Sequence, residues 1–312
     1  MREFVHKKIL VTGAGGFLGA HVVRALLGRG VPEKNIYAPS SGDSDLRIWK
    51  NCVRAVDGQN IVIHIAGITG NAEFHKAHPG SIFFDNIMMG VGLMEAARQA
   101  NVEKFVTIGS VAEYPADAEN PFREENIWAG FPEKNHAPYA VAKKMLLVQG
   151  QAYRAEYGFR AVHLLMTNMY GPGEHEEGGP IPSFIRRISA AKESDVIEIW
   201  GTGAPTRDFL NVEDAAEAIV LAAEKYEKIE PINIGSGREV SIKELAETIA
   251  KLLNFSGSFK FDATKPDGQT RRVLDVSCAE REFGFSAKTS LETGLQKTIE
   301  WYIKKLKMKN EK

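Results

Sequence analysis

The sequence has little of several features that mark particular classes of protein. Its 312 residues include only two cysteines, Cys52 and Cys278, which are too few for a disulfide framework and suit a reducing cytoplasm. With 39 Lys and Arg against 40 Asp and Glu, the formal net charge of −1 gives no overall field favouring nucleic acid or an anionic membrane. No apolar run approaches the roughly 18 residues of a membrane span, and no apolar segment like a signal peptide precedes the first predicted strand. We expect a cytoplasmic protein without nucleic-acid or membrane partners, and we assign no metal site.

The pattern of apolar residues predicts an α/β fold. At 44% hydrophobic and 25% charged residues, the chain can bury a large core. Short apolar runs alternate with helical spacing through the first half, which is typical of a parallel sheet covered on both faces. The predicted strands are 8–12, 35–38, 60–65, 104–109 and 161–166. The clearest helices are 82–100 and 137–157, and 17–27 also has helical apolar spacing. No internal repeat or low-complexity linker separates the halves, so we expect a smaller α/β lobe interleaved with the first.

The second half of the chain is less regular. Residues 174–180 indicate a mobile loop, and a helix over 182–192 is predicted to begin at a proline. Ser241 with Glu244, and Thr289 with Glu292, have the spacing of a capping box and should open the last two long helices.

A glycine-rich turn joins the first predicted strand to the first helix. Gly13 permits a sharp turn, Gly16 lets the backbone approach a pyrophosphate, and Gly19 allows the helix to pack closely on the strand. The N-terminus of the helix would then face the anion. The spacing is G-x-x-G-x-x-G, not the more usual G-x-G-x-x-G, so the loop taken alone leaves a purely structural turn open.

Tyr139 and Lys143 stand four residues apart on a predicted helix and share one face. A cation beside a phenol favours the phenolate, so we expect Lys143 to lower the pKa of Tyr139 and make it a proton donor near neutral pH. Tyr-x-x-x-Lys also arises by chance on amphipathic helices, and it is the order of this pair after the glycine turn that indicates a function.

Together these motifs resemble the extended short-chain dehydrogenases/reductases, the NAD(P)-dependent epimerase/dehydratase group acting on nucleotide sugars. Further matching segments are His64-Ile65-Ala66-Gly67, 86–97, Gly109-Ser110, Asn168-Met169-Tyr170-Gly171-Pro172 and Arg207-Asp208-Phe209-Leu210. The resemblance implies a Rossmann-like doubly wound sheet, in which Ser110 and Tyr139 hydrogen-bond the reacting carbonyl or alcohol and Lys143 holds the nicotinamide ribose. The cofactor residues that it implies are Gly13, Gly16, Phe17, Leu18, Gly19, Ser40, Ser41, Ala66, Gly67 and Lys143.

The same resemblance divides the chain between two binding tasks. Residues 1–172, with 208–234 returning to them, would bind NAD(P). Residues 173–207 and 235–312 would form the nucleotide-sugar-binding lobe.

The second half has a narrower resemblance, to GDP-L-fucose synthase-like 4-keto-sugar reductases. The matching segments are 182–187, 200–210 and 264–268. A diphosphate needs cations at fixed places, and the resemblance puts Arg187, Arg207 and Lys265 there. It also implies substrate contacts for Trp200 and Asn168. The alternatives are solvated surface charges for the three cations and core packing for Trp200.

Two departures from that group bear on the reaction. In GDP-L-fucose synthases a cysteine two residues after the serine is the base of a 3,5-epimerisation, and a histidine before Ile-Pro is its acid. Ala112 and Gly179 stand at those positions here, so the resemblance implies reduction without epimerisation. His175 or Glu113 could substitute, although such residues are more often solvated or structural. Val111-Ala112 also replace the Asp-Glu pair that sugar 4,6-dehydratases need.

We therefore predict an NAD(P)H-dependent reductase of the 4-keto group of a GDP- or dTDP-linked 4-keto-6-deoxy sugar. The alternative is a UDP-glucose-type 4-epimerase with tightly bound NAD, which needs only the same Ser110, Tyr139 and Lys143. A third hypothesis, a nucleotide sensor without catalysis, has no use for an intact proton-donor set.

Cofactor choice depends on the end of the second predicted strand, where an acidic side chain would favour NAD. The run Tyr37-Ala38-Pro39-Ser40-Ser41-Gly42 has no acid before Asp43. This slightly favours NADP, with Ser40 and Ser41 as phosphate donors and Arg47 as a cation. Gly15, however, stands where some NADP-using relatives have an arginine.

Three further features of the sequence need interpretation. Asn86 either supports the active site or caps its helix, and His64 is interpreted as a satisfied core residue and not as a site residue. Apolar residues occupy more than one face of helices 82–100 and 137–157. Relatives pack these two helices into a four-helix bundle, which implies a homodimer. Alternatively, the side chains all face their own sheet.

Overall fold

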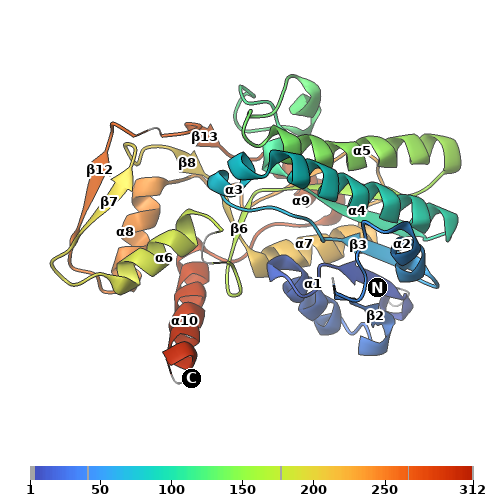
Figure 1. Cartoon of the computed structure of the whole chain (residues 1–312), viewed down its shortest axis with the longest axis horizontal. Helices are drawn as coiled ribbons and strands as arrows, with labels where there is room; N and C mark the ends of the chain where they lie inside the picture. The colour runs from blue at the N-terminus through green and yellow to red at the C-terminus, as the bar shows by residue number, and fades with distance from the viewer. Residues whose placement is uncertain (1–3, 41, 176–177, 266, 311–312) are drawn as a thin grey trace.

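The computed structural model describes residues 4–40, 42–175, 178–265 and 267–310. Figure 1 shows a large lobe around a parallel sheet and a smaller lobe at the other end of the long axis, with the C-terminal helix projecting from the smaller one.

The large lobe is organised by a six-stranded sheet in the order β10-β5-β4-β3-β1-β2, with every neighbouring pair parallel. Its strands are β1 (Ile9–Thr12), β2 (Ile36–Tyr37), β3 (Ile61–His64), β4 (Lys104–Ser110), β5 (Ala161–Met166) and β10 (Ile232–Ile234). All residues of β1, β3 and β5 are buried, as in a sheet with both faces covered. The predicted α/β fold with a doubly wound parallel sheet is confirmed.

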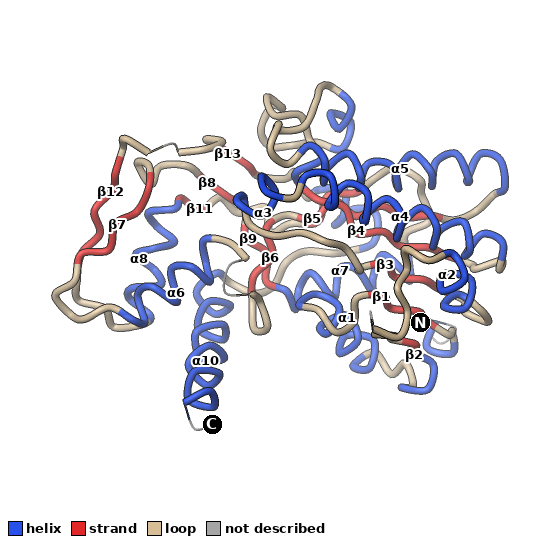
Figure 2. Tube along the Cα trace, in the orientation of Figure 1, coloured by secondary structure: helices blue, strands red, loops and turns tan. Residues whose placement is uncertain are grey.

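Helices cover this sheet in two layers, which Figure 2 shows above and below the strands. These helices are α1 (Phe17–Gly28), α2 (Trp49–Val56), α3 (Ala72–Ala77), α4 (Pro79–Gln99), α5 (Ala137–Tyr157), α7 (Val212–Lys225) and α9 (Ser277–Phe283). Successive strand residues point to opposite faces, so Ile9 and Val11 pack on the layer of α1, α7 and α9, whereas Leu10 packs on the layer of α2, α4 and α5.

The small lobe has its own apolar core, to which three helices contribute: α6 (Pro180–Ala190), α8 (Ile242–Leu252) and α10 (Leu291–Asn310). Its strands are β7 (Val196–Trp200) paired with β12 (Ser258–Asp262), and β8 (Thr206–Arg207) between β11 (Val240–Ser241) and β13 (Arg271–Arg272). Between the lobes, β6 (Asn168–Tyr170) pairs with β9 (Phe209–Asn211). From β9 the chain re-enters the large lobe as α7 and β10 and then returns to the small lobe at β11. Among the helices that the structure describes, none combines the length and apolar character needed to span a bilayer.

Four short 3-10 turns complete the described part of the chain. They are η1 (Phe4–His6), η2 (Glu33–Asn35), η3 (Val111–Glu113) and η4 (Glu124–Trp128). The turn η3 directly follows β4 and bears on the site below.

Some element boundaries differ from those predicted. The helix over 137–157 has the predicted ends, but α4 begins at Pro79 and α6 at Pro180, ahead of the predicted 82 and 182. Each starts at a proline, because the N–H groups of the first helical turn have no partner within the helix and the missing N–H of proline therefore costs no hydrogen bond.

The two predicted helix caps have different outcomes. Ser241 caps α8 as predicted, since its Oγ accepts from the Glu244 N–H at 3.0 Å. The prediction for Thr289 is wrong by one residue. Ser290 accepts from the Thr293 N–H at 3.2 Å and precedes the first residue of α10.

Candidate active site

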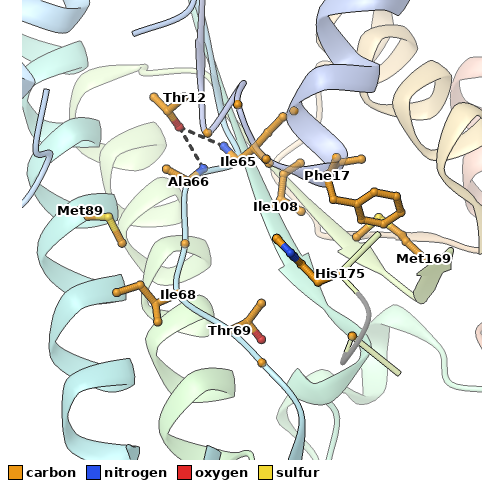
Figure 3. Close-up of a pocket in the computed structure, with 18 of the residues that line it drawn as sticks. Thr12, Phe17, Ile65, Ala66, Ile68, Thr69, Met89, Ile108, Met169 and His175 are labelled. Atoms are coloured by element: carbon orange, nitrogen blue, oxygen red, sulfur yellow. Dashed lines mark hydrogen bonds between the residues drawn. The ribbon is translucent and has the colours of Figure 1, made fainter. Parts of the chain in front are cut away.

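A cavity of about 1390 Å³ opens where the carboxyl ends of β1, β3 and β4 meet the start of α1. It exceeds the range of about 300 to 1000 Å³ usual for one small ligand, so a dinucleotide and a second substrate fit together. Figure 3 shows Phe17, Met169 and His175 on one side of it and Ile68 and Met89 on the other. The predicted residues that line it are Gly13, Gly16, Phe17, Leu18, Gly19, Ser40, Ala66, Gly67, Ser110, Tyr139 and Lys143. Ser41 lies outside the described residues.

The glycine loop has room only for backbone. Gly13 has a φ of +70°, and a Cβ there would lie 2.8 Å from the Ala66 N. A Cβ on Gly19 would lie 2.1 Å from the Gly13 O, so the first turn of α1 packs on the loop itself. No side chain caps α1 at Gly16, which leaves the N–H groups of its first turn for an anion. These residues fit the diphosphate of NAD(P).

Thr12 and His64 hold the ends of β1 and β3 together below the cavity. Thr12 Oγ1 accepts from the N–H groups of Ile65 and Ala66, each at 3.1 Å, as the dashed lines in Figure 3 show. The same oxygen lies 2.9 Å from His64 Nδ1. Burial, followed by the charge of Lys143, lowers the pKa of His64 to about 3, so the ring is neutral. Because the two N–H groups use both lone pairs of Thr12 Oγ1, its hydroxyl donates and Nδ1 accepts. His64 is a satisfied core residue, as predicted.

Asn86 lies inside α4 and does not cap it, so the capping interpretation is wrong. Its Oδ1 accepts from the Ile68 N–H at 3.0 Å, and its Nδ2 donates to the Ile68 O at 2.9 Å and the Ile82 O at 2.7 Å. A Cβ on the neighbouring Gly67 would lie 2.9 Å from Asn86 Oδ1 and 3.2 Å from Lys143 Nζ. Asn86 therefore fixes the loop after β3 against the cavity.

Ser110 ends β4 and is held from behind by Glu113 in the turn η3. Glu113 Oε1 accepts from the Ser110 N–H at 2.7 Å, and Oε2 lies 3.0 Å from His163 Nε2. The other ring nitrogen of His163 lies 2.7 Å from Thr107 Oγ1. Glu113 is 0% exposed. It is a structural residue, as interpreted from the sequence, and it has no access to a substrate as a base.

Tyr139 and Lys143 line the cavity from the first two turns of α5, with Lys143 Nζ over the Tyr139 ring, 5.8 Å from its centroid. Burial raises the pKa of Tyr139, and the charge of Glu113 raises it further, whereas a hydrogen bond with Thr69 lowers it. The pKa of Tyr139 is therefore raised and not lowered as predicted, because burial is the largest cause of its shift. Burial also lowers the pKa of Lys143 to about 8, although Glu113 opposes the shift.

Two cavity residues, Thr69 and Ser44, and the buried His75 beside Thr69 carry little signal in the sequence. Thr69 bonds the Tyr139 hydroxyl and lies 3.2 Å from His75 Nε2, and the His75 ring stands edge-on to Tyr139 with centroids 5.4 Å apart. At the far end, the buried Ser44 Oγ has no hydrogen-bond partner among the described residues. Only the position of Thr69 two residues after Gly67 could have pointed to it.

Carboxylates surround the residues predicted to bind a cofactor phosphate after β2. Ser40 Oγ donates to Asp43 Oδ2 at 2.5 Å. Arg47 is held by Asp45 at 2.7 Å and by Asp85 at 3.2 Å. A phosphate at this end would therefore compete with carboxylates for the donors predicted to bind it.

The four predicted substrate residues of the small lobe do not line the cavity. Trp200 is 67% exposed, so the core-packing alternative is wrong, and Lys265 Nζ lies 5.7 Å from its ring centroid. Arg187 donates to a backbone carbonyl of β7. Burial lowers the pKa of Arg207, and it lowers the pKa of Arg272 to about 10, with the like charge of Arg207 as the next cause. Neither guanidinium has a salt bridge within the described ranges, and a diphosphate would supply the missing negative charge.

Of the two positions without an epimerisation residue, Ala112 lies beside Ser110 and Gly179 lines a cavity. The Ala112 N–H donates to Ser110 Oγ at 3.2 Å. Gly179 and Asn168 line a side cavity of about 110 Å³, which shares Glu174 with the main one. His175 lines the main cavity itself.

Comparison with known proteins agrees with this site. Residues 9–235 match the model of the NAD dependent epimerase/dehydratase family. The chain is 33% identical over 304 residues to a probable GDP-L-fucose synthase from Oryza sativa subsp. japonica, covering 95% of this chain and 92% of that protein. It is 34% identical over 306 residues to a GDP-L-fucose synthase from Sinorhizobium fredii, with coverages of 95% and 96%. A solved GDP-mannoheptose C4 reductase from Campylobacter jejuni with NADP bound matches with a TM-score of 0.88 at 25% identity, covering 96% of this chain and 99% of that one.

Proposed function

The chain belongs to the NAD dependent epimerase/dehydratase family and is an NAD(P)-dependent oxidoreductase, and we propose that it reduces the 4-keto group of a nucleotide-linked 4-keto-6-deoxy sugar. One observation carries the proposal, the single cavity in which Ser110, Tyr139 and Lys143 face the glycine loop of α1. Relatives of similar length named GDP-L-fucose synthase support GDP as the nucleotide. The match to a C4 reductase supports the position of the reduced carbon.

Each catalytic residue has one task in this proposal. The bound cofactor supplies the hydride that C4 receives. Ser110 and Tyr139 hold the carbonyl oxygen, and Tyr139 donates the proton that this oxygen gains. The raised pKa of Tyr139 keeps the phenol protonated before the reaction, as a donor must be. Lys143, cationic below its pKa of about 8, binds the ribose hydroxyls of the cofactor.

The small lobe would hold the nucleotide. Arg207 and Arg272 bind the diphosphate together with Arg187, and the exposed Trp200 ring offers the base a stacking surface beside Lys265. In this division, residues 1–172 and 208–234 bind NAD(P), and residues 173–207 and 235–312 bind the nucleotide sugar.

We assign NADP(H) as the preferred cofactor. The C4 reductase with NADP bound supports this choice. The sequence supports it as well, because Ser40 stands after β2 where an acidic side chain would favour NAD. Because Asp43 holds Ser40 and two carboxylates hold Arg47, the preference over NADH should be modest.

Reduction should occur without 3,5-epimerisation. Ala112 and Gly179 have no proton to exchange, and the hydrogen bonds and burial of Glu113 keep it from the substrate.

We also propose a homodimer through α4 and α5, which lie side by side in Figure 1. Phe84, Met88, Met145 and Val148 are 59%, 39%, 41% and 40% exposed, so these side chains do not all face their own sheet. A four-helix bundle would bury them, and the mass in solution from light scattering tests the pairing.

A substrate panel tests the function. GDP-, dTDP-, UDP- and CDP-4-keto-6-deoxy sugars are each offered with NADPH and with NADH, and the products are identified by NMR. The proposal expects one NAD(P)H consumed for each sugar reduced. Interconversion of UDP-glucose and UDP-galactose without net use of cofactor would instead establish the 4-epimerase.

A further inference from the structure

Glu174 lies just after β6, at the boundary of the two lobes, and its side chain belongs to two cavities. It lines the main cavity with the catalytic residues. It also lines the side cavity of about 110 Å³, whose other walls include Asn168, Phe209 and the start of α6. The proposed reaction gives Glu174 no task.

The Glu174 carboxyl lies in the wall between the two cavities, and one of its oxygens has no hydrogen-bond partner in the described part of the chain. Its Oε2 is buried and forms no hydrogen bond with any residue in the described part of the chain. A Cβ on Gly178 would lie 3.0 Å from Oε1, and one on Gly179 would lie 3.9 Å from it. The two glycines therefore leave the space that the carboxyl occupies. A buried polar atom without a partner is costly, and native structures rarely keep one without a reason.

Burial favours the protonated form of the carboxyl. Burial raises the pKa of Glu174 to about 8, although a hydrogen bond from the Gly171 backbone lowers it. The start of α6 offers an anion few donors, because Pro180 and Pro182 have no N–H and the Ser183 N–H is already bonded within the turn, which leaves the N–H of Ile181. A protonated carboxyl offers one donor and one acceptor, which an alcohol matches and a cation does not.

We propose that Glu174 and the side cavity form a subsite for one hydroxyl group of the sugar. The subsite rests on the proposed function, since it assumes a nucleotide sugar in the main cavity. A cavity of about 110 Å³ is several times the 10–15 Å³ or so that one water needs, so the hydroxyl and the carbon that bears it fit. Asn168 adds a second polar group to the wall. The subsite would select sugars by their hydroxyl pattern, independently of the proton donor at C4.

The test is a double-mutant-type cycle that changes Glu174 in the protein and one hydroxyl in the sugar and measures the dissociation constant of each combination. The whole chain is saturated with NADP⁺, which cannot reduce a ketone, so the ligand stays intact. Calorimetry gives the dissociation constants of GDP-4-keto-6-deoxymannose and of its 2-deoxy and 3-deoxy analogues. We expect one analogue to bind the wild type about ten- to a hundredfold more weakly than the parent sugar.

Three variants separate recognition from packing. Glu174→Leu should abolish the difference between that analogue and the parent sugar, and Glu174→Ala, which enlarges the side cavity instead of filling it, should do the same. Glu174→Gln keeps a donor and an acceptor and should retain most of the difference. Glu193→Leu is the control, because Glu193 is exposed just beyond α6 and its loss should change no ratio.

The outcomes distinguish the subsite from the function. If Glu174→Leu and Glu174→Ala weaken the parent and deoxy sugars by the same factor, or keep the full difference, the subsite is refuted while the reductase stands. If the wild type binds none of the three GDP sugars but binds NADP⁺, the assignment of GDP as the nucleotide fails and the subsite proposed for this sugar fails with it, whereas the reductase is judged separately by the panel of four nucleotides.

Discussion

Replacing Lys143 by methionine should make the protein more stable and inactive. Lys143 is 4% exposed, and its ammonium has no hydrogen-bond partner within the described ranges. Burial lowers its pKa from 10.5 to about 8, a difference of 10.5 − 8 = 2.5. At about 1.36 kcal/mol per pKa unit, holding this cation costs the folded protein at most ~3 kcal/mol. Methionine keeps most of the stem without the charge, so the free energy of unfolding should rise by about 1–3 kcal/mol.

The gain should depend on pH in a defined direction. Because the pKa of Lys143 is lower in the folded protein than in the unfolded chain, the cost is fully present below about pH 8. As the pH rises from about 8 towards 10.5, the folded protein loses the proton first and the wild type recovers its stability. The advantage of Lys143→Met should therefore be largest near pH 7 and small near pH 10.

Urea denaturation of the cofactor-free proteins at both pH values measures this difference. The matched control is Lys144→Met on the same helix. Lys144 Nζ donates to the Ile127 O at 2.6 Å, so losing it should destabilise the fold by about 1 kcal/mol or more. Turnover by Lys143→Met should fall at least about a hundredfold. A Lys143→Met protein that is less stable than the wild type at pH 7, or whose stability difference ignores pH, would refute the reasoning.

Three further results are expected. Tyr139→Phe should lower kcat/KM by about a hundredfold or more with an NADPH dissociation constant close to that of the wild type, because only the proton donor is lost; a variant that keeps a tenth of the activity contradicts this role. Reduction in deuterated water should leave C3 and C5 of the product without deuterium by NMR, since Ala112 and Gly179 exchange no proton; label there would show that another residue does. Gly19→Ala should weaken NADPH binding and destabilise the fold by about 1–3 kcal/mol, because its Cβ would stand 2.1 Å from the Gly13 O. Gly15→Ala is the control, since a Cβ there would have no atom within 4 Å, and both thermal unfolding and cofactor titration should leave it close to the wild type.

The fold was predictable to the extent that local patterns specify it. Alternation of apolar runs and helical spacing predicts the parallel sheet, and the helix 137–157 has its predicted ends because a proline marks its first turn and Gly158 adopts a left-handed φ at its end. The cap at Ser290 was predicted one residue early, since Thr289 and Ser290 are equally good caps in sequence and only the path of the backbone chooses between them.

Some features of the candidate site follow from local sequence, and others depend on tertiary contacts. The sequence by itself determined the glycine turn, the pair Tyr139 and Lys143, and their order along the chain, because these depend on local spacing and on the few residue types that can do the chemistry. Only the tertiary structure decided how these groups titrate, since burial and charges from distant segments set the pKa of Tyr139 and Lys143. It also decided that Glu113 is enclosed behind Ser110 and that Glu174 is set into the cavity wall, because whether a carboxylate is buried depends on contacts between residues far apart in the chain.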